Sequence, residues 1–441
     1  MSASARTPPT PTSSPSSSGS SGLLSVEAAL ERMLTGLRPL PAEEVPLAEA
    51  LGRVLAEPLT ALTTLPPWDN TAMDGFAVRA ADVADASPSH PVELRVIGEV
   101  AAGHAPTATV EPGTAIRILT GAMLPLGADA VVPVEDTDAQ PGLADLPERV
   151  AVRFAVAVGE SVRRAGSDIR AGDPLCPAGT LVRPATLALL AAAGHATVRA
   201  HRPPRVVVLA TGDELAAPGT PLGPGQIPES NGPMLAAQAR RLGAEVRTGP
   251  PAPDRLDAVL GALRGALVWA DVVVASGGVS VGAHDVVRTA MESVARLDLW
   301  RVAVQPGKPL AFARATGEDG GGERLLFGLP GNPVSSFVTF ELFVRPVLRA
   351  LAGHARPVDR PQVRARLGAA VTKATGRRAY LRVTLRRDPR GDGMLEARLA
   401  GGQGSNVLSA LAAADGLAIV PEGLAGLPAG AEVDVLPLDG G

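Results

Sequence analysis

Hydrophobic residues in the second half of the chain gather in short continuous runs that alternate with longer stretches of helical spacing. Four runs predict strands: 206–209, 245–248, 272–275 and 325–327. The stretches between them predict three helices: 232–242, 255–270 and 335–351. Because continuous apolar strands that alternate with helices are typical of a parallel sheet covered on both faces, residues 201–355 predict a doubly wound α/β domain. Ligands of such sheets bind beyond the carboxyl ends of the strands.

The first two hundred residues follow different patterns. Ser25 is expected to cap an amphipathic helix that continues to Leu34, and a second helix is expected over 184–193. Between 66 and 159, short β-like runs separated by glycine and proline predict a small β-rich domain. These runs are 92–96, 115–119, 130–134 and 150–156.

The last part of the chain predicts a separate β domain over 356–441. Its expected strands are 363–367, 379–385, 395–399 and 418–420. A chain of 441 residues is long enough for about three domains of ~150 residues each, so a multidomain protein with clefts between domains is expected.

The composition of the chain argues against several classes of function. Aromatic residues make up 2% of the chain and basic residues are mixed with acids, which argues against nucleic-acid binding. No run of about 18 apolar residues predicts a membrane helix. The single Cys176 excludes an internal disulfide and a cysteine-based metal site, and it favours a reducing compartment. Residues 1–22 are rich in Ser, Pro, Thr and Gly and contain no apolar signal region, so we expect a disordered tail and a cytoplasmic protein.

Polar or glycine-bearing loops follow the predicted strands. One loop carries Thr211, Gly212, Asp213 and Glu214, and the next runs from Ser276 to Asp285. In the second loop Gly277 and Gly278 leave backbone N–H groups free to face an anion, with Ser280 beside them. A tight turn with Asp285 as a helix cap is the alternative interpretation.

Three further loops carry candidate ligand-binding groups. The loop 227–232 places Glu229, Ser230 and Asn231 before a helix, where Asn231 could also be an ordinary N-cap. The loop 328–336 offers backbone donors at a helix N-terminus, a suitable cradle for a phosphate or oxyanion. Its candidate residues are Pro330, Gly331, Asn332, Pro333 and Ser335. Between these loops lies Lys308, one of only two lysines in the chain, as a point charge for a phosphate.

Acidic residues near the predicted strand ends indicate a cation. Four of them would repel each other in one cleft unless a cation or a proton intervened: Glu214, Glu229, Asp254 and Asp285. Mg²⁺ is the expected occupant, because it prefers one or two carboxylates together with phosphate oxygens and water. The histidines show no metal-ligand spacing, and His284 beside Asp285 is expected to be an ordinary surface residue.

The segment 66–78 packs more polar groups into a short run than a turn requires. Asp69 and Asn70 favour a turn, whereas Asp74 lies between apolar neighbours. A structural turn and a binding site are both open on this segment alone.

Taken together, these segments resemble the bacterial MoeA family of molybdopterin molybdenumtransferases, which also includes the C-terminal part of animal gephyrin. The likeness spans residues 23–440. It rests on eight segments in the order of the family: PPWDNTAMDGFAV, IRILTGAMLP, RRAGSDI, ATGDEL, IPESNG, SGGVSVGAHD, QPGKPLAF and GLPGNPVSS.

The resemblance implies a helical linker and dimerisation domain (23–65 and 160–200), a β-rich insertion (66–159), a molybdopterin-binding α/β domain (201–355) and a C-terminal β-barrel (356–441). It implies a homodimer in which the insertion of one subunit closes the cleft of the other. The implied reaction takes adenylylated molybdopterin from a molybdopterin adenylyltransferase, inserts molybdenum from molybdate, and releases AMP with Mg²⁺ as cofactor.

The resemblance also carries roles over to particular residues. Asp69, Asp74 and Thr120 match site positions of the insertion domain, and Asp168 matches an acid near the linker. Asp254 joins these four as a catalytic candidate, while Glu214, Glu229 and Asp285 are candidate metal ligands. Between Asp69 and Asp74 we favour Asp74, because a turn role suffices for Asp69.

Two departures from the family pattern stand out. Some members have a second lysine where this chain has Gln305, and some have Asp-Thr-Asn where it has Glu229-Ser230-Asn231. Two other functions stay open: the adenylyltransferase that makes the intermediate, and a non-catalytic scaffold like gephyrin. The long insertion and the C-terminal domain argue against the first.

Overall fold

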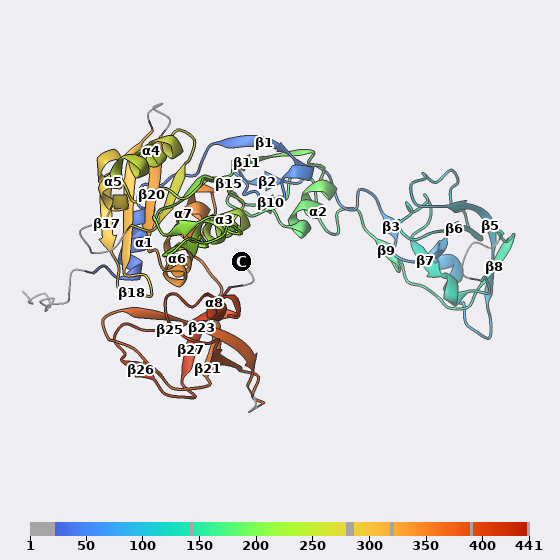
Figure 1. The fold of residues 1–441 in the computed structure, drawn as a ribbon. Helices are drawn as coiled ribbons and strands as arrows, with labels where there is room; N and C mark the ends of the chain where they lie inside the picture. Colours follow the sequence, from blue (N-terminus) through green and yellow to red (C-terminus); the bar gives the residue numbers. More distant parts are fainter. Residues whose placement is uncertain (1–22, 141–144, 279–285, 318–321, 389–390, 439–441) are drawn as a thin grey trace, which may run out of the picture. The chain divides into compact units, whose positions relative to one another are not determined.

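The computed structural model describes residues 23–140, 145–278, 286–317, 322–388 and 391–438 (Figure 1). The chain divides into two compact units. One unit consists of residues 42–201, and the other combines the residues before 42 with those from 202 onward. Among the described helices, none has both the length and the apolar character needed to cross a membrane.

A six-stranded sheet forms the centre of the larger unit. Its strands, in spatial order, are β15 (Glu245–Thr248), β12 (Arg205–Ala210), β16 (Val272–Ser276), β20 (Glu323–Leu329), β19 (Pro309–Thr316) and β17 (Arg296–Arg301). The first four are mutually parallel, while β19 and β17 are antiparallel to their neighbours. The predicted α/β fold and its four parallel strands are confirmed, and the two antiparallel strands are additions that the pattern did not predict.

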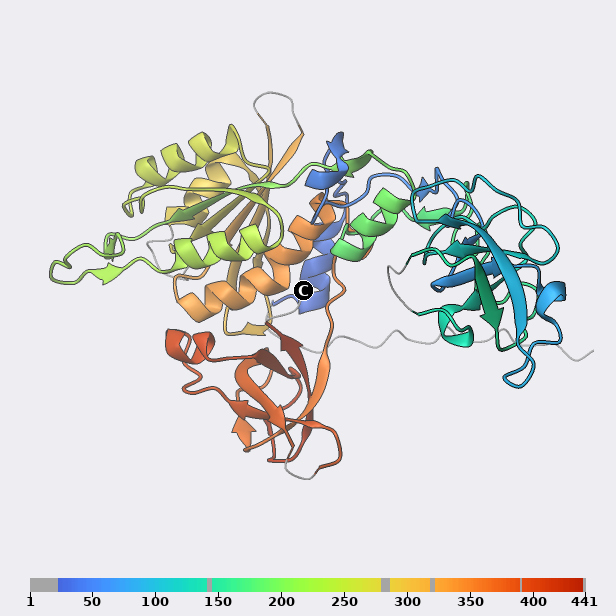
Figure 2. The ribbon, with the colours of Figure 1, turned by 90° about the vertical axis from the view of Figure 1, so that its right-hand side faces the viewer.

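Successive strand residues face opposite helical layers, so both faces of this sheet are buried. Val206 and Val208 pack on one side, and Val207 and Leu209 on the other. The first side is covered by α1 (Val26–Leu34), α3 (Asn231–Arg241), α6 (Pro333–Thr339) and α7 (Arg345–Leu351). The second is covered by α4 (Leu256–Leu267) and α5 (Val286–Val294), and Figure 2 shows the two layers on either side of the sheet.

Helix α1 lies in the larger of the two compact units. Ser25 caps it as expected, with its hydroxyl accepting from the Ala28 N–H at 3.1 Å. The buried face of the helix, with Ala29 and Met33, is part of the core that covers the sheet. The packing of this apolar face against residues far away in the chain places α1 in the larger unit.

The predicted helix over 335–351 is interrupted by a π-helical turn. This turn, Phe340–Val344, lies between α6 and α7. Pro346 lacks an N–H group, so it cannot donate to the carbonyl four residues earlier, and a regular α-helix cannot run through this position unchanged.

The C-terminal strands close into a barrel. Its strands are β21 (Val363–Leu367), β23 (Arg378–Arg387), β24 (Leu395–Leu399), β25 (Gly416–Val420) and β27 (Glu432–Pro437). They pair in the order β23, β24, β21, β27, β25 and back to β23, which leaves no open edge in this ring. The short β18 (Val304–Gln305) pairs with β23 from the α/β side, and α8 (Leu408–Ala412) follows β24. The expected barrel is confirmed, and β27 was not predicted.

The unit 42–201 contains a five-stranded sheet and a smaller part. The sheet consists of β7 (Ala130–Pro133), β4 (Gly75–Val78), β6 (Thr114–Ile118), β5 (Val92–Val100) and β8 (Arg149–Val152). The smaller part pairs β1 (Ala42–Pro46) with β11 (Thr197–His201) and β2 (Leu59–Thr60) with β10 (Pro174–Cys176), and contains α2 (Pro184–Ala192). The β-rich character predicted for 66–159 and the helix predicted near 184 are both confirmed.

Minor elements complete the description. Short strand pairs join β3 (Asn70–Thr71) to β9 (Val162–Arg163), β13 (Leu215–Ala216) to β14 (Ile227–Pro228), and β22 (Val371–Thr372) to β26 (Gly426–Leu427). Single 3₁₀ turns occur at Leu47–Glu49, Ala80–Val83 and Val134–Asp136.

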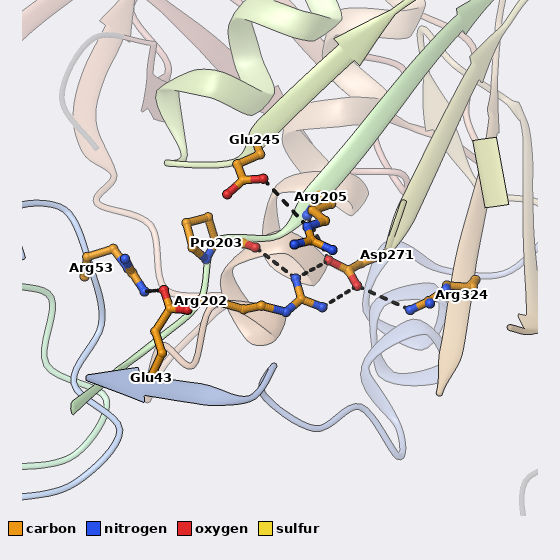
Figure 3. Close-up of polar contacts among 8 residues, drawn as sticks. All are labelled: Glu43, Arg53, Arg202, Pro203, Arg205, Glu245, Asp271 and Arg324. Atoms are coloured by element: carbon orange, nitrogen blue, oxygen red, sulfur yellow. Dashed lines mark hydrogen bonds and ion pairs between the residues drawn. The ribbon is translucent and has the colours of Figure 1, made fainter. Parts of the chain in front are cut away.

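A buried carboxylate joins the starts of three neighbouring strands (Figure 3). Asp271, directly before β16, accepts two hydrogen bonds of 2.7 Å from the Arg202 guanidinium. It also accepts the N–H of Arg205 at 2.8 Å, and Arg324 of β20 lies 3.5 Å away. The Asp271 side chain is only 4% exposed, so water cannot replace these partners.

Substituting Asp271→Ala is expected to destabilise the larger unit by about 3–5 kcal/mol, because buried guanidinium groups lose their carboxylate. Urea unfolding should be followed in a Trp68→Phe background, where Trp269 and Trp300 report on residues 202–441. The control is Asp257→Ala, which removes an ion pair that is fully exposed to solvent and should leave the midpoint unchanged. Equal midpoints for the two variants would contradict the role given to Asp271.

Candidate functional site

A cavity of about 600 Å³ lies at the carboxyl ends of the parallel strands. The chain leaves β12 toward β15 on one side and returns to β16 on the other, so the loops after β12 and β16 diverge at a topological switch point. We call this the strand-end cavity. Its walls include the predicted site residues Thr211, Glu214, Glu229, Ser230, Asn231, Asp254, Ser276, Gly277, Gly278, Pro330, Gly331, Asn332 and Pro333.

The inner wall of the strand-end cavity requires a glycine. Gly277 has φ +104°, and a Cβ on it would lie 2.4 Å from the Thr211 carbonyl oxygen. The Thr211 hydroxyl is buried and has no hydrogen-bond partner among the described residues. An unpaired buried hydroxyl beside a bare backbone is suited to a ligand that comes close to the main chain.

Asn231 connects the loops at the cavity and does not cap its own helix. Its Nδ2 donates to Ser276 Oγ at 2.8 Å and to the Gly331 carbonyl at 2.7 Å. Its Oδ1 is buried and unpaired within the described part of the chain. The N-cap interpretation of Asn231 is therefore wrong, because Asn231 is the first residue of α3 after Ser230, and Glu229 Oε1 accepts the N–H of Gly232 at 2.6 Å.

Three carboxylates gather at the mouth of the strand-end cavity. The N–H of Asp254 donates to Asp213 Oδ1 at 3.1 Å. Desolvation, followed by the charges of Glu214 and Asp213, raises the pKa of Asp254 above its usual value. No group of three metal-ligating side chains forms among the residues that the structure describes. The candidates Ser280, His284 and Asp285 lie outside the described residues.

Lys308 and Ser335 line a different cavity, of about 660 Å³, between the α/β domain and the barrel. We call it the basic cavity, because four cationic side chains and no carboxylate are among the described residues that line it: Lys308, Lys373, Arg377 and Arg382. Both lysines of the chain therefore lie on one cavity. Pro309 lines this cavity and the strand-end cavity alike.

Arg382 is a buried cation with no acidic partner among the residues that the structure describes. It is 1% exposed, and its Nη2 donates to the carbonyls of Gly402 at 2.9 Å and Gly404 at 3.1 Å. Its Nε has no partner among the described residues, and burial lowers its pKa. A nearby anion would offset the cost of burying this charge.

The unit 42–201 holds the second group of candidates. Asp74 Oδ1 accepts the N–H and the hydroxyl of Thr120, each at 2.6 Å, and these bonds lower the pKa of Asp74. Both residues line a cavity of about 450 Å³ together with Phe76 and Arg117. Asp74 Oδ2 accepts no hydrogen bond from any described residue, so this oxygen is available to a ligand.

Asp69 and Asp168 are placed differently. Both carboxylate oxygens of Asp69 are used, one by the Ala165 N–H at 2.8 Å and one by Arg164 at 2.6 Å. These bonds lower the pKa of Asp69 and tie the segment 66–78 to the returning chain. Asp168 is exposed, and its N–H donates to the Leu65 carbonyl at 3.1 Å. The contacts of Asp69 support the structural role that the sequence favoured for it.

Sequence reasoning missed the barrel residues that line the two cavities of the larger unit. Arg382 lies within a regular strand, where nothing in the pattern distinguishes it from its neighbours. Asn406 and Leu408 complete the strand-end cavity from the barrel side. Lys373 carried a usable signal, because it is the second of only two lysines.

Comparison with known protein families gives three adjoining matches. The "MoeA N-terminal region (domain I and II)" matches residues 24–194. The "probable molybdopterin binding domain" matches residues 207–350, and the "MoeA C-terminal region (domain IV)" matches residues 364–438.

Individual proteins agree with these matches over nearly the full chain. A molybdopterin molybdenumtransferase 2 of Mycobacterium tuberculosis H37Rv is 40% identical over 418 residues, covering 93% of this chain and 98% of the relative. A molybdopterin molybdenumtransferase of Nostoc is 38% identical, covering 90% and 88%. The crystal structure of the molybdopterin biosynthesis MoeA protein of Pyrococcus horikoshii is 29% identical with a TM-score of 0.77, covering 94% and 100%.

Gly277→Ala is expected to destabilise the larger unit by about 2 kcal/mol or more, because the added methyl meets the Thr211 carbonyl and φ is positive. The control is Gly261→Ala in the middle of α4, where a Cβ has no heavy atom within 4 Å. That change should stabilise the protein by up to about 1 kcal/mol through helix propensity. Thermal unfolding measures both, and shifts of the same sign would contradict the close approach.

Proposed function

Because this chain belongs to the MoeA family, we propose that it catalyses the insertion of molybdenum into adenylylated molybdopterin. The substrates are this adenylylated pterin and molybdate, and cleavage of the adenylyl phosphoanhydride releases AMP. The sulfur atoms that receive molybdenum belong to the pterin, in keeping with a chain that has a single, buried cysteine. A cytoplasmic setting completes the proposal.

The strand-end cavity is the proposed site of the adenylylated pterin. It combines bare backbone at Gly277 and Gly278 with the unpaired Thr211 hydroxyl and Asn231 carbonyl oxygen. At the N-terminus of α6, Pro333 has no N–H group and the Val334 N–H donates to the Ser405 carbonyl at 3.0 Å, so the backbone N–H groups of the glycine loop are the proposed donors. Such groups can hold phosphate oxygens and pterin donors without a positive side chain.

The carboxylates at this cavity fit Mg²⁺. Glu214 and Asp254 are hard oxygen donors, and the raised pKa of Asp254 reflects desolvation and then the repulsion of Glu214 and Asp213, which a divalent cation would relieve. We assign these two residues, together with Asp285 and phosphate oxygens, as holders of the ion. A bound Mg²⁺ would neutralise the negative charge that develops on the phosphates as the anhydride is cleaved.

The basic cavity is the observation that carries the proposal. A doubly charged oxyanion needs several cations or donors without neighbouring carboxylates, and Lys308, Lys373 and Arg382 meet this requirement. The unpaired Nε of buried Arg382 favours an anion over a neutral ligand. We therefore assign molybdate to this cavity, with Gln305 in the place that some relatives give to a lysine. Molybdate and tungstate are nearly equal in size and charge, and both fit this description.

Asp74 and Thr120 belong to the other compact unit, so their role rests on the family resemblance. We propose that they act at the strand-end cavity of the partner subunit in a homodimer. Asp74 is preferred over Asp69 as the group that meets the ligand, because one of its oxygens is free of hydrogen bonds. Its lowered pKa keeps it ionised at neutral pH and able to orient a ligand through its charge.

Two alternative functions, a molybdopterin adenylyltransferase and a non-catalytic scaffold, differ from the proposed one in what they require. A molybdopterin adenylyltransferase would consume ATP and free molybdopterin. A scaffold would need neither the basic cavity nor the unpaired polar groups of the strand-end cavity.

The proposed function is tested by incubating the protein with adenylylated molybdopterin, Mg²⁺ and molybdate, and measuring AMP release and active cofactor. Lys308→Ala should raise the KM for molybdate about tenfold while leaving kcat at saturating molybdate nearly unchanged, since it removes one charge from the anion site. The matched control is Arg386→Ala, an exposed barrel residue outside the cavity. Consumption of ATP with free molybdopterin would reassign the chain as the adenylyltransferase.

The shared active site is tested by mixing two inactive variants. Asp74→Asn and Gly331→Trp alter different units of the chain, and each homodimer should lose more than about 99% of its activity. A mixed dimer carries one intact site composed of the unaltered halves, so refolding the variants together should restore about a quarter of wild-type activity. Restoration of none would contradict a site shared between subunits, provided that the melting temperatures match the wild type.

A further inference from the structure

One loop of the barrel borders both the strand-end cavity and the basic cavity. This loop, residues 400–407, connects β24 to α8, which packs beside α6 (Figure 1). We call it the bridging loop. Gln403, Gly404 and Ser405 line the basic cavity, whereas Asn406 lines the strand-end cavity. Two consecutive residues therefore line different proposed sites, and the function proposed above gives neither of them a role.

Reciprocal hydrogen bonds attach the bridging loop to Arg382. The Arg382 N–H donates to Gln403 Oε1 at 2.9 Å, and Gln403 Nε2 donates to the Arg382 carbonyl at 3.1 Å. The same nitrogen donates to the Gly401 carbonyl at 3.0 Å, so both N–H groups of this amide have acceptors within the protein. The Arg382 guanidinium holds the loop as well, through the carbonyls of Gly402 and Gly404. The loop is therefore tied to the residue that we assign to the oxyanion.

A backbone hydrogen bond attaches the bridging loop to the α/β domain. The N–H of Val334, in the first turn of α6, donates to the Ser405 carbonyl at 3.0 Å. The two neighbours of Val334 line different cavities, Pro333 the strand-end cavity and Ser335 the basic cavity. A displacement of the bridging loop would therefore alter the walls of both cavities.

Asn406 offers the strand-end cavity a side-chain amide that is not used elsewhere. Its side chain is exposed and forms no hydrogen bond with any described residue. A Cβ on residue 404 would lie 2.9 Å from Asn406 Oδ1, so Gly404 is what leaves room for this side chain. The described carboxylates of the cavity only accept hydrogen bonds when ionised, and both N–H groups of Asn231 Nδ2 already have acceptors. An additional neutral donor at this wall suits an oxygen acceptor on a ligand.

We propose that Asn406 is a specificity-determining residue whose Nδ2 donates to an oxygen of the substrate in the strand-end cavity. Gln403 is the positioning residue that holds the bridging loop, and with it Asn406, against Arg382. The inference rests on the function proposed above and adds two barrel residues to it. The acceptor is a phosphate oxygen or the pterin carbonyl, two acceptors that the same substrate carries. Because both N–H groups of Gln403 are used within the protein, it acts through the loop and influences both cavities.

A neutral amide suits this wall better than a cationic side chain would. A lysine or arginine beside Glu214 and Asp254 would compete with Mg²⁺ for their carboxylates. An amide donates to the substrate without neutralising these acids. Asn406 therefore adds recognition of the substrate and leaves the proposed cation site intact.

The role of Asn406 is tested by the kinetics of AMP release from the full-length protein at saturating Mg²⁺. Asn406→Ala should raise the KM for adenylylated molybdopterin about fivefold, the loss of one hydrogen bond, and leave the KM for molybdate unchanged. Ser409→Ala, at an exposed residue of α8, is the matched control and should change neither KM. Calorimetry with AMP and Mg²⁺ then identifies the acceptor. A phosphate contact weakens AMP binding to Asn406→Ala by the same factor, whereas a contact with the pterin carbonyl leaves AMP binding unchanged.

Gln403→Ala supplies the second measurement. It should raise the KM for molybdate and the KM for adenylylated molybdopterin together, each about threefold or more, because the bridging loop borders both cavities. A purely structural role would lower the amount of folded enzyme, which reduces kcat and leaves both KM values unchanged. This split between KM and kcat separates positioning from stability, and the exposed Asn406 side chain provides a test that does not depend on the folding of the barrel.

The outcomes separate the inference from the proposed function. Wild-type KM values in Asn406→Ala, with a wild-type protein that releases AMP, would overturn the role of Asn406 and leave the transferase function intact. A Gln403→Ala variant in which only kcat falls would overturn the positioning role of the loop. Absence of AMP release by the wild type would overturn the proposed function itself.

Discussion

The buried carboxylate of Asp271 is the interaction on which the larger unit depends. It holds the first residues of β12, β16 and β20 together through its contacts with Arg202, the Arg205 N–H and Arg324. These strands are paired in register from Val206, Val272 and Leu325 to their last residues. Fixing one end of three parallel strands therefore fixes the other end, where Ala210, Ser276 and Leu329 meet the cavity loops. Contacts at the amino ends of the strands therefore position the site at their carboxyl ends.

Unsatisfied groups concentrate where ligands are proposed. Within the described part of the chain, Thr211 Oγ1 and Asn231 Oδ1 have no partner at the strand-end cavity, and Gln305 Oε1 and Arg382 Nε have none at the basic cavity. Each costs about 1–3 kcal/mol without a partner. Violations of local rules that gather at two cavities are typical of functional sites that stability elsewhere supports.

Sequence patterns were informative where the signal is local. The four parallel strands, the Ser25 cap and the polar loops could be read from the chain, because apolar runs and capping residues act over a few positions. Arg382, β17, β19 and the packing of α1 could not, because they depend on pairings between residues far apart in the chain. The alternative N-cap interpretation of Asn231 was wrong for the same reason, since its partners Ser276 and Gly331 lie 45 and 100 residues away.

The strand-end cavity and the basic cavity are lined by side chains of opposite charge. Three acids and no lysine or arginine are among the described residues of the strand-end cavity, whereas the basic cavity has the opposite composition. At short range in a partly desolvated site, such fields exclude ions of the wrong sign. In the function proposed above, a phosphate-bearing substrate would therefore enter the acidic cavity together with a cation, and a free oxyanion would bind in the basic one. The first turn of α6 contributes Pro333 to one cavity and Ser335 to the other, so this turn borders both of the sites proposed for the two anions.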